Sequence, residues 1–391
     1  MATKLTEFRP RQRHPTSARR LAGLPEPLQK RRAEALALVA EPFKGLTAEG
    51  QVVPGLYSIQ KTGISTQPIV EAAQAFLAAL SPEQRAGACF DLEAGEWRQW
   101  SNIHPFLMRH GQMLEELDEA QRETALGLLR ATLSASGYQT ARDIMRLNEY
   151  IGWIVGGKWE EYGEWLYWLS VFGEPSATEP WGWQIDGHHL IVNCFVLGDQ
   201  IVVTPTFMGS EPVDGRDGKW DGIRVFEAEE RLGLELMRSL DPEQQARALV
   251  AGQPGRAMTE AFQDNLVLPY AGINSCELSD EQRARLVDLI AVYTGRIRPG
   301  HAELRLEEIK RHLDDTYFAW MGTYDEDAVF YYRIQSPVVC IEFDHQAGIA
   351  LDNDEPSRNH IHTIVRTPNG NDYGKDLLRL HYEMHPHHRR S

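Results

Sequence analysis

Cysteine is scarce in this sequence, and none of its cysteines has the spacing that metal or redox chemistry uses. Four of them are scattered over 391 residues without a CxxC pair: Cys89, Cys194, Cys276 and Cys340. A scattered set of this kind is typical of small buried side chains in a reducing compartment rather than of a disulfide framework. The sequence therefore predicts free thiols.

Long apolar runs and an excess of positive charge are also missing. No stretch approaches the roughly 18 consecutive apolar residues that a membrane-spanning helix needs. Asp and Glu outnumber Lys and Arg by 56 to 40, which gives a net charge of −16. Because phosphate groups repel such a chain, neither a nucleic acid nor an anionic membrane is expected as a partner. Arg19 and Arg20 precede a segment broken by prolines and charges, so we expect no signal peptide and a cytoplasmic protein.

The familiar catalytic signatures are absent as well. The sequence contains no G-x-S-x-G elbow, P-loop, dinucleotide fingerprint, HExxH pair or kinase motif set. Each of these motifs places a nucleophile, a phosphate cradle or a pair of zinc ligands in a fixed local geometry. Their absence argues against serine-hydrolase, nucleotide and NAD chemistry, so any small-molecule substrate has to be inferred from other residues.

A helix-start pattern is present four times. It reads LSPEQR at Leu80, LDEAQR at Leu117, LDPEQQ at Leu240 and LSDEQR at Leu278. Ser or Asp at the N-cap accepts a hydrogen bond from a backbone N–H, and Gln three residues later bonds back to the cap. Two pairs of such boxes at similar spacing predict an internal repeat.

Strand-like segments further along support the repeat. Trp168–Ile185 and Tyr317–Ile334 align without a gap. We therefore predict an α+β protein made of a duplicated helices-then-strands unit whose β portions pack together. The predicted parts are an extension over residues 1–69, a first repeat over 70–225 and a second repeat over 226–391. We expect the extension to hold one helix near 26–40 and a strand near 53–59.

Side chains that can bind metal concentrate in three segments, WGWQIDGHHLIVN (Trp181–Asn193), IEFDHQ (Ile341–Gln346) and NHIHTIVRTPNGNDYG (Asn359–Gly374). Because alternate residues of a strand share a face, His360 and His362 project together and suit one metal. Glu342 and Asp344 share a face in the same way. The sequence therefore predicts a histidine and carboxylate site shared between the two repeats.

The expected ligand set is His188 or His189 from the first repeat, with His360 and His362 from the second. Two or three imidazoles with a carboxylate suit Zn²⁺, Fe²⁺ or Mn²⁺, and three protein ligands leave a position open for water. Two alternatives stay open. The same side chains could form a polar site without metal, or they could be satisfied by ordinary hydrogen bonds on a half-polar sheet face.

The segment RTPNGNDYG adds three further candidates. Arg366 is suited to hold a substrate carboxylate, and Asp372 or Tyr373 to act as an acid or base. The alternative is a Gly/Asn turn that carries a surface charge pair.

Four other groups are weaker candidates. Asp186 is first of all a turn residue, with the orientation of a histidine as the minority interpretation. A polar and aromatic stretch with Trp100, Asn102, His104 and Arg109 could reach the site from the helical part. The aromatic residues Trp181, Trp183, Tyr331 and Tyr332 are more typical of core than of a ligand pocket. The histidine-rich C-terminal tail is expected to be solvated.

These motifs resemble an uncharacterised bacterial family that is known only as a domain of unknown function. The resemblance rests on WGWQIDGHHL, YYRIQSPVVCIEFD and NHIHTIVRTPNGNDYG and covers residues 28–381. It implies that the DGHH and HxH…NDYG blocks are family features, and it supplies no activity.

The prediction from these residues is a metal-dependent hydrolase of a small polar or anionic substrate. The metal would activate a water, Glu342 or Asp344 would act as general base, and Arg366 would bind an anionic group. A non-haem iron oxygenase is the enzymatic alternative, because it uses two histidines and a carboxylate. A metal-free protein that binds a sugar or an aromatic ligand is the alternative from a different class.

Overall fold

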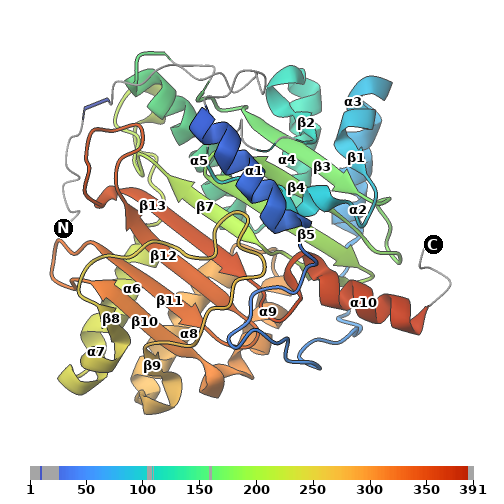
Figure 1. The fold of residues 1–391 in the computed structure, drawn as a ribbon. Coiled ribbons are helices and arrows are strands. Elements are labelled where there is room, and N and C mark those ends of the chain that lie inside the picture. Colours follow the sequence, from blue (N-terminus) through green and yellow to red (C-terminus); the bar gives the residue numbers. More distant parts are fainter. Residues whose placement is uncertain (1–8, 11–25, 104–107, 109, 158–160, 386–391) are drawn as a thin grey trace.

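The computed structural model describes residues 9–10, 26–103, 108, 110–157 and 161–385, and these residues form an α+β fold (Figure 1). The α-helices in this described part are α1 (Glu26–Ala40), α2 (Gln67–Ala79), α3 (Pro82–Ala88), α4 (Glu119–Thr132), α5 (Ala135–Ile154), α6 (Glu227–Ser239), α7 (Pro242–Ala248), α8 (Asp280–Thr294), α9 (His301–Lys310) and α10 (Lys375–Met384). None of them is long and apolar enough to cross a bilayer.

The strands form one mixed sheet in the order β1-β3-β4-β5-β7-β13-β12-β11-β10-β8, with β2, β6 and β9 paired beside this path. They are β1 (Cys89–Phe90), β2 (Gln112–Met113), β3 (Tyr167–Phe172), β4 (Trp181–Gly187), β5 (Leu190–Leu197), β6 (Gln200–Val202), β7 (Thr206–Ser210), β8 (Leu249–Ala251), β9 (Ile273–Asn274), β10 (Tyr317–Gly322), β11 (Phe330–Gln335), β12 (Cys340–Gln346) and β13 (Ser357–Arg366). The antiparallel pair β7–β13 joins the two β portions edge to edge.

The sheet register repeats between the two halves. Leu169 pairs with Ile185, and the aligned residues Phe318 and Ile334 also pair. Each half also ends in a short parallel strand at the outer edge of the sheet. In the first half β1 pairs with β3, and in the second half β8 pairs with β10. These equivalent registers support the duplication, which, like the boundaries at residues 69 and 225, stays a prediction.

The four predicted helix starts are confirmed. Each carries a capping box in which the N-cap side chain and the Gln at N3 bond reciprocally, at Ser81, Asp118, Asp241 and Ser279. The boxes also meet in pairs, because Gln84 bonds Gln121 at 2.9 Å and Gln244 bonds Gln282 at 3.0 Å. The cap glutamines therefore tie together the helices that the boxes begin.

The N-terminal segment is partly as predicted. Helix α1 matches the expected helix, but the strand expected near 53–59 is wrong. This segment is held by contacts that involve side chains and not by strand pairing. The Val53 N–H donates to Asn369 Oδ1 at 3.0 Å, and the Tyr57 hydroxyl donates to the Pro368 carbonyl at 2.7 Å. The segment is therefore held by individual hydrogen bonds to the turn after β13 and does not join the sheet.

The two faces of the sheet differ in chemistry. On one face, alternate residues such as Ile341, Phe343 and Ile361 pack with apolar residues of the helices in the main core. The other face carries buried polar side chains, and α1 and long connecting segments cross it (Figure 1). The candidate ligands lie on this second face. The four cysteines are free, as predicted.

Candidate metal centre

Three histidine rings converge on the polar face of the sheet. The Nε2 atoms of His360 and His362 lie 3.0 Å apart, and each lies 3.2 Å from Nε2 of His189. All three side chains are buried. His360 and His362 alternate on β13 as the strand period predicts, and His189 reaches them from the turn between β4 and β5, which belongs to the other half of the sheet.

The backbone at this turn places His189. The two turn residues are His188 and His189. His189 has a φ of 64°, a left-handed conformation that is uncommon for residues other than Gly, although Asn, Asp and His adopt it more often than the others. Its N–H donates to the Asn102 carbonyl at 3.3 Å, and its carbonyl accepts from Gly209 at 2.8 Å. Backbone strain of this kind persists where surrounding contacts over-determine it, and it concentrates at functional sites.

Gly209 makes room for the rings. It pairs with His362 in the β7–β13 register. A Cβ atom at this position would lie 3.0 Å from Cδ2 of His362 and 3.3 Å from Cδ2 of His189, closer than side chains ordinarily pack. A glycine at this position therefore lets two histidines from different strands face one another.

The outer nitrogens of the rings fix the tautomers. Nδ1 of His360 lies 2.7 Å from the Ala347 carbonyl, which can only accept, so Nδ1 carries the proton. Nδ1 of His362 lies 2.6 Å from Oε1 of Glu260, and a carboxylate likewise accepts. In the neutral rings both Nε2 atoms then present lone pairs to each other at 3.0 Å. Two facing lone pairs repel unless a cation, a metal or a proton, lies between them.

The loop that carries the Ala347 carbonyl, the partner of His360, is itself held in place by hydrogen bonds. Glu211 accepts backbone hydrogen bonds from Ile349, Ala350 and Leu351 at 2.9–3.0 Å, which fixes the loop that presents the Ala347 carbonyl. Support of this kind behind a ligand sets its ring orientation and raises its basicity.

The electrostatic environment differs between the two rings of β13. Burial lowers the pKa of His360 well below its usual value, and the neighbouring His362 lowers it further. Burial also acts to lower the pKa of His362, but the Glu260 carboxylate outweighs it and raises that pKa. For Glu260, the attraction of His362 outweighs burial and lowers the pKa. The Glu260 carboxylate and the protonated His362 ring therefore stabilise each other's charged forms.

His188 is not part of the triangle. Its ring stacks on His189 with centroids 3.9 Å apart, and its Nδ1 lies 2.8 Å from Oδ1 of Asn148. Of the two histidines predicted as alternatives, the structure brings His189 to His360 and His362 and places His188 behind it.

The two predicted carboxylates differ. Glu342 is fully buried, and its oxygens accept from the Met258 and Thr259 N–H groups, the Thr259 hydroxyl and the Tyr331 hydroxyl. Such a carboxylate is saturated and acts as a clamp on the segment around residue 258. Asp344 pairs across the strands with His362 and keeps Oδ1 without a partner among the described residues. Burial raises the pKa of Asp344 to about 7.

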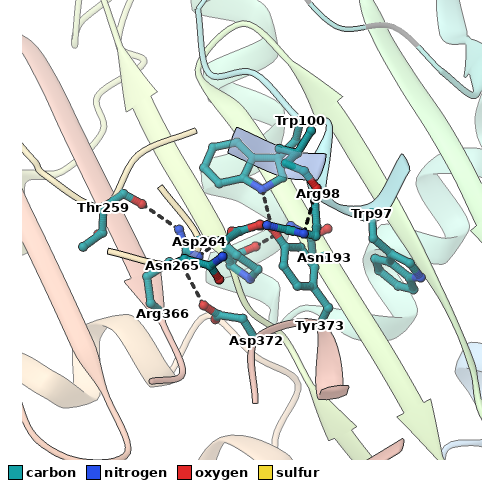
Figure 2. Close-up of polar contacts among 12 residues, drawn as sticks. Trp97, Arg98, Trp100, Asn193, Thr259, Asp264, Asn265, Arg366, Asp372 and Tyr373 are labelled. Carbon is teal, nitrogen blue, oxygen red and sulfur yellow. Dashed lines mark hydrogen bonds and ion pairs between the residues drawn. The ribbon is translucent and has the colours of Figure 1, made fainter. Parts of the chain in front are cut away.

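Arg366, Asp372 and Tyr373 lie in a separate buried network (Figure 2). The Arg366 guanidinium donates to Asp372 Oδ2, Asp264 Oδ1 and the Thr259 carbonyl at 2.7–2.8 Å. The Tyr373 hydroxyl donates to Asp264 at 3.0 Å and accepts from Trp100 Nε1 at 2.8 Å. The structure does not place these groups among the histidines, and every nitrogen of Arg366 is engaged by protein. The network instead anchors Thr259, the neighbour of Glu260.

The weaker candidates divide between core and surroundings. Trp181, Trp183 and Tyr332 belong to the main core, and the Tyr331 hydroxyl donates to Glu342 at 2.6 Å. Asn102 contacts the His189 backbone, whereas His104 and Arg109 lie outside the described residues, as does the tail beyond His385. Asp186 accepts from the Ser101 N–H at 3.2 Å and lies within β4, one residue before its end at Gly187, so it is not a turn residue.

Sequence reasoning missed Glu260, Gly209 and Arg256. Glu260 lies in an irregular segment without periodicity, so nothing in the sequence connects it to His362. Arg256 is exposed and directly precedes Ala257, whose N–H donates to Asp344 Oδ2 at 3.0 Å. Its positive charge acts on Glu260, His360 and His362. It is therefore a cation at the edge of the histidine centre.

Comparison with known proteins identifies the family. The chain belongs to the family described as Protein of unknown function (DUF3500), whose model matches residues 62–375. This range holds all three converging histidines and Glu260, and the predicted resemblance to a family of unknown function is confirmed. No curated protein and no solved structure matches the chain.

Proposed function

We propose that this protein is a metal-dependent hydrolase of a small anionic substrate, with the metal held by Nε2 of His189, His360 and His362. The convergence of three Nε2 atoms, with Nδ1 of His360 and of His362 facing acceptors, carries this proposal. Three imidazoles with an open position are a donor set that catalytic zinc uses. A divalent metal held there would polarise a bound water or a substrate oxygen.

The residues fit such a metal. Tetrahedral zinc with bonds of about 2.0–2.1 Å to nitrogen places its nitrogen ligands about 3.3 Å apart. The observed separations of 3.0, 3.2 and 3.2 Å are within a few tenths of an ångström of this geometry. The carboxylate behind His362 and the carbonyl behind His360 are the usual outer partners of metal-bound histidines.

The donor set favours hydrolysis over the oxygenase alternative. A non-haem iron oxygenase of the common type needs two histidines and one carboxylate on the same metal. The clusters of the described residues are the three histidines and, separately, Glu260 and Asp344 with His362. Neither group joins a carboxylate to two of the converging histidines, and Glu260 bonds Nδ1 of His362, outside the triangle.

Two further residues suit the roles of general base and of substrate-binding cation. Asp344 is the better general base of the two predicted carboxylates, because its Oδ1 is unpartnered while Glu342 is saturated. Arg256 replaces Arg366 as the group that attracts an anionic substrate, because the Arg366 nitrogens are consumed by protein partners. Exposure leaves the Arg256 guanidinium accessible to a small molecule.

Elemental analysis of the purified protein tests the proposal. The tail histidines His385, His387 and His388 are first replaced by serine, so that they cannot scavenge metal. We expect about one zinc per chain, and less than a tenth of that in the His360→Ala/His362→Ala variant. His312→Ala is the matched control, because it removes a histidine outside the centre and should leave the metal content unchanged.

Three outcomes separate the possibilities. One equivalent of iron instead of zinc would favour the oxygenase alternative. If the protein binds no metal after incubation with Zn²⁺, Fe²⁺ and Mn²⁺, the metal proposal is wrong. A proton shared between the Nε2 atoms would then hold the three histidine rings together. Full occupancy in the double variant would place the metal elsewhere.

A further inference from the structure

A cavity lies on the helix-covered face of the sheet, opposite the face that carries the histidines. Its volume is about 210 Å³, and it is bounded by the segment 56–62, by α9 and by strands β6, β7 and β13. Thr206, Met208 and Val365 form part of its floor. These residues alternate along β7 and β13 with Gly209 and Ile364, which face the histidine centre. The cavity is thus separate from the histidines and does not rest on the proposed hydrolase.

One buried polar group in this cavity lacks a partner. His301, the first residue of α9, is 4% exposed, and its Nε2 is buried without a hydrogen-bond partner in the described part of the chain. Burial lowers the pKa of His301 to about 4, so the ring is neutral near pH 7. An unpartnered buried nitrogen is unfavourable unless a ligand or a water satisfies it. A neutral imidazole offers that bond to a hydroxyl or carbonyl group.

The charges around the cavity favour an anion. Three arginines line it, Arg296, Arg305 and Arg311, against a single carboxylate, Glu308. Arg296 is paired with Glu229 and Arg305 with Glu308. Arg311 is exposed and has no ion pair in the described part of the protein. One cation at the mouth is therefore available to a ligand.

The body of the cavity is largely apolar. Leu133, Met208, Ile297 and Ile309 contribute to its wall, and Met208 and Ile309 are fully buried. An apolar wall favours contact with hydrocarbon, because the contact removes apolar surface from water. A ligand that matches both features has a short apolar body and one negative group.

We propose that this cavity binds a small carboxylate with an apolar body. Arg311 attracts the carboxylate at the mouth, the apolar wall holds the hydrocarbon part, and Nε2 of His301 bonds a polar substituent on it. The site needs no metal and lies behind the strands that carry the histidines.

Three probes with the same hydrocarbon chain and different head groups test the class. Hexanoate, 1-hexanol and hexylamine are compared by saturation-transfer NMR on protein stripped of metal with a chelator. We expect hexanoate to bind most tightly and hexylamine least. In Arg311→Gln, hexanoate should bind about tenfold more weakly, which matches the loss of one charge-assisted contact, while 1-hexanol should be unaffected. Equal binding of hexanoate and hexylamine by the unaltered protein would overturn the proposal.

Two further variants locate the site. 6-Hydroxyhexanoate should bind more tightly than hexanoate, and His301→Leu should remove this advantage, because leucine keeps the volume and lacks the nitrogen. His360→Ala should leave hexanoate binding intact. If His360→Ala abolishes it, the carboxylate binds at the histidine centre and the cavity proposal is wrong. If His301→Leu does not fold, Arg311→Gln still decides the question, because Arg311 is exposed.

Discussion

Asp344 and His362 face each other across the β12–β13 register, and Asp344 keeps one carboxylate oxygen without a partner among the described residues. A general base is most effective when its pKa lies near the working pH, and this carboxyl lies beside a proposed metal ligand. Burial raises the pKa of Asp344 to about 7, and a bound divalent cation would lower it from there.

The first prediction follows from this pair. A base must be ionised, so hydrolysis should rise with pH up to about 7 or somewhat below and then level off. Asp344→Asn should keep its zinc and lose about 100-fold or more in kcat, together with this acid limb. The measurement is the pH profile of p-nitrophenyl acetate hydrolysis, with zinc content determined on the same samples. An unchanged profile in the variant would exclude Asp344 as the base.

The second prediction concerns Arg256, the exposed cation at the edge of the centre. Arg256→Gln should raise KM about tenfold for mono-p-nitrophenyl succinate, an anionic ester, because one charge-assisted contact is lost. For p-nitrophenyl acetate, which is neutral, KM should stay the same. Equal effects on both esters would show that Arg256 does not select for substrate charge.

The third prediction uses Gly209, which separates two histidine rings. Gly209→Ala should weaken zinc binding by at least about tenfold. The added Cβ would lie 2.8 Å from the Ile361 carbonyl oxygen and 3.0 Å from the His362 ring, so β13 and its histidines have to shift, and displaced ligand surroundings typically cost about 10–100-fold in metal affinity. Gly127→Ala is the control. Gly127 lies within α4 with open space around it, so alanine there should stabilise the protein by about 0.5–1 kcal/mol. Zinc competition against a chromogenic chelator measures the first effect and thermal unfolding the second.

Local rules predicted much of this centre. The two-residue period of a strand placed His360 and His362 on one face, and capping chemistry located the helix starts at Ser81 and Ser279. Both rules need only neighbouring residues. The choice between His188 and His189 was left open because it depends on a left-handed turn that contacts from Asn102 and Gly209 stabilise.

Long-range partners could not be predicted in the same way. Arg366 was expected to bind substrate, but Asp264 reaches it across 102 residues of sequence and consumes one of its nitrogens. Glu260 reaches His362 from an equal separation of 102 residues. Both acids lie in a segment without helical or strand periodicity, so their positions follow from how that segment crosses the sheet.

The fourth prediction separates a structural from a catalytic role for Arg366. Arg366→Met should lower the free energy of unfolding by about 3–5 kcal/mol, because Asp372 loses its buried partner and Asp264 one of its two. Chemical denaturation measures this loss. In the protein that remains folded, KM for the anionic ester should be within a factor of about two of the unaltered value. A large rise in KM without a loss of stability would restore Arg366 as a substrate ligand.

The fifth prediction concerns pH and Glu230, which bonds His345 and Arg358 from α6. Burial acts to raise the pKa of Glu230, but the hydrogen bonds and charges of His345 and Arg358 outweigh it and lower the pKa from 4.5 to about 2. A carboxyl with a lowered folded-state pKa stabilises the protein above its unfolded pKa, and this stabilisation is lost as pH falls through the folded value. The stabilisation from Glu230 should amount to roughly 3 kcal/mol above pH 4.5 and disappear between about pH 4.5 and 2.

The variant Glu230→Gln tests this pH dependence. Its side chain cannot titrate, so the difference in unfolding free energy between the two proteins should shrink over this interval. Urea denaturation at half-unit pH steps measures it, and a difference that stays constant from pH 6 to 2.5 would show that the ion pairs of Glu230 do not lower its pKa.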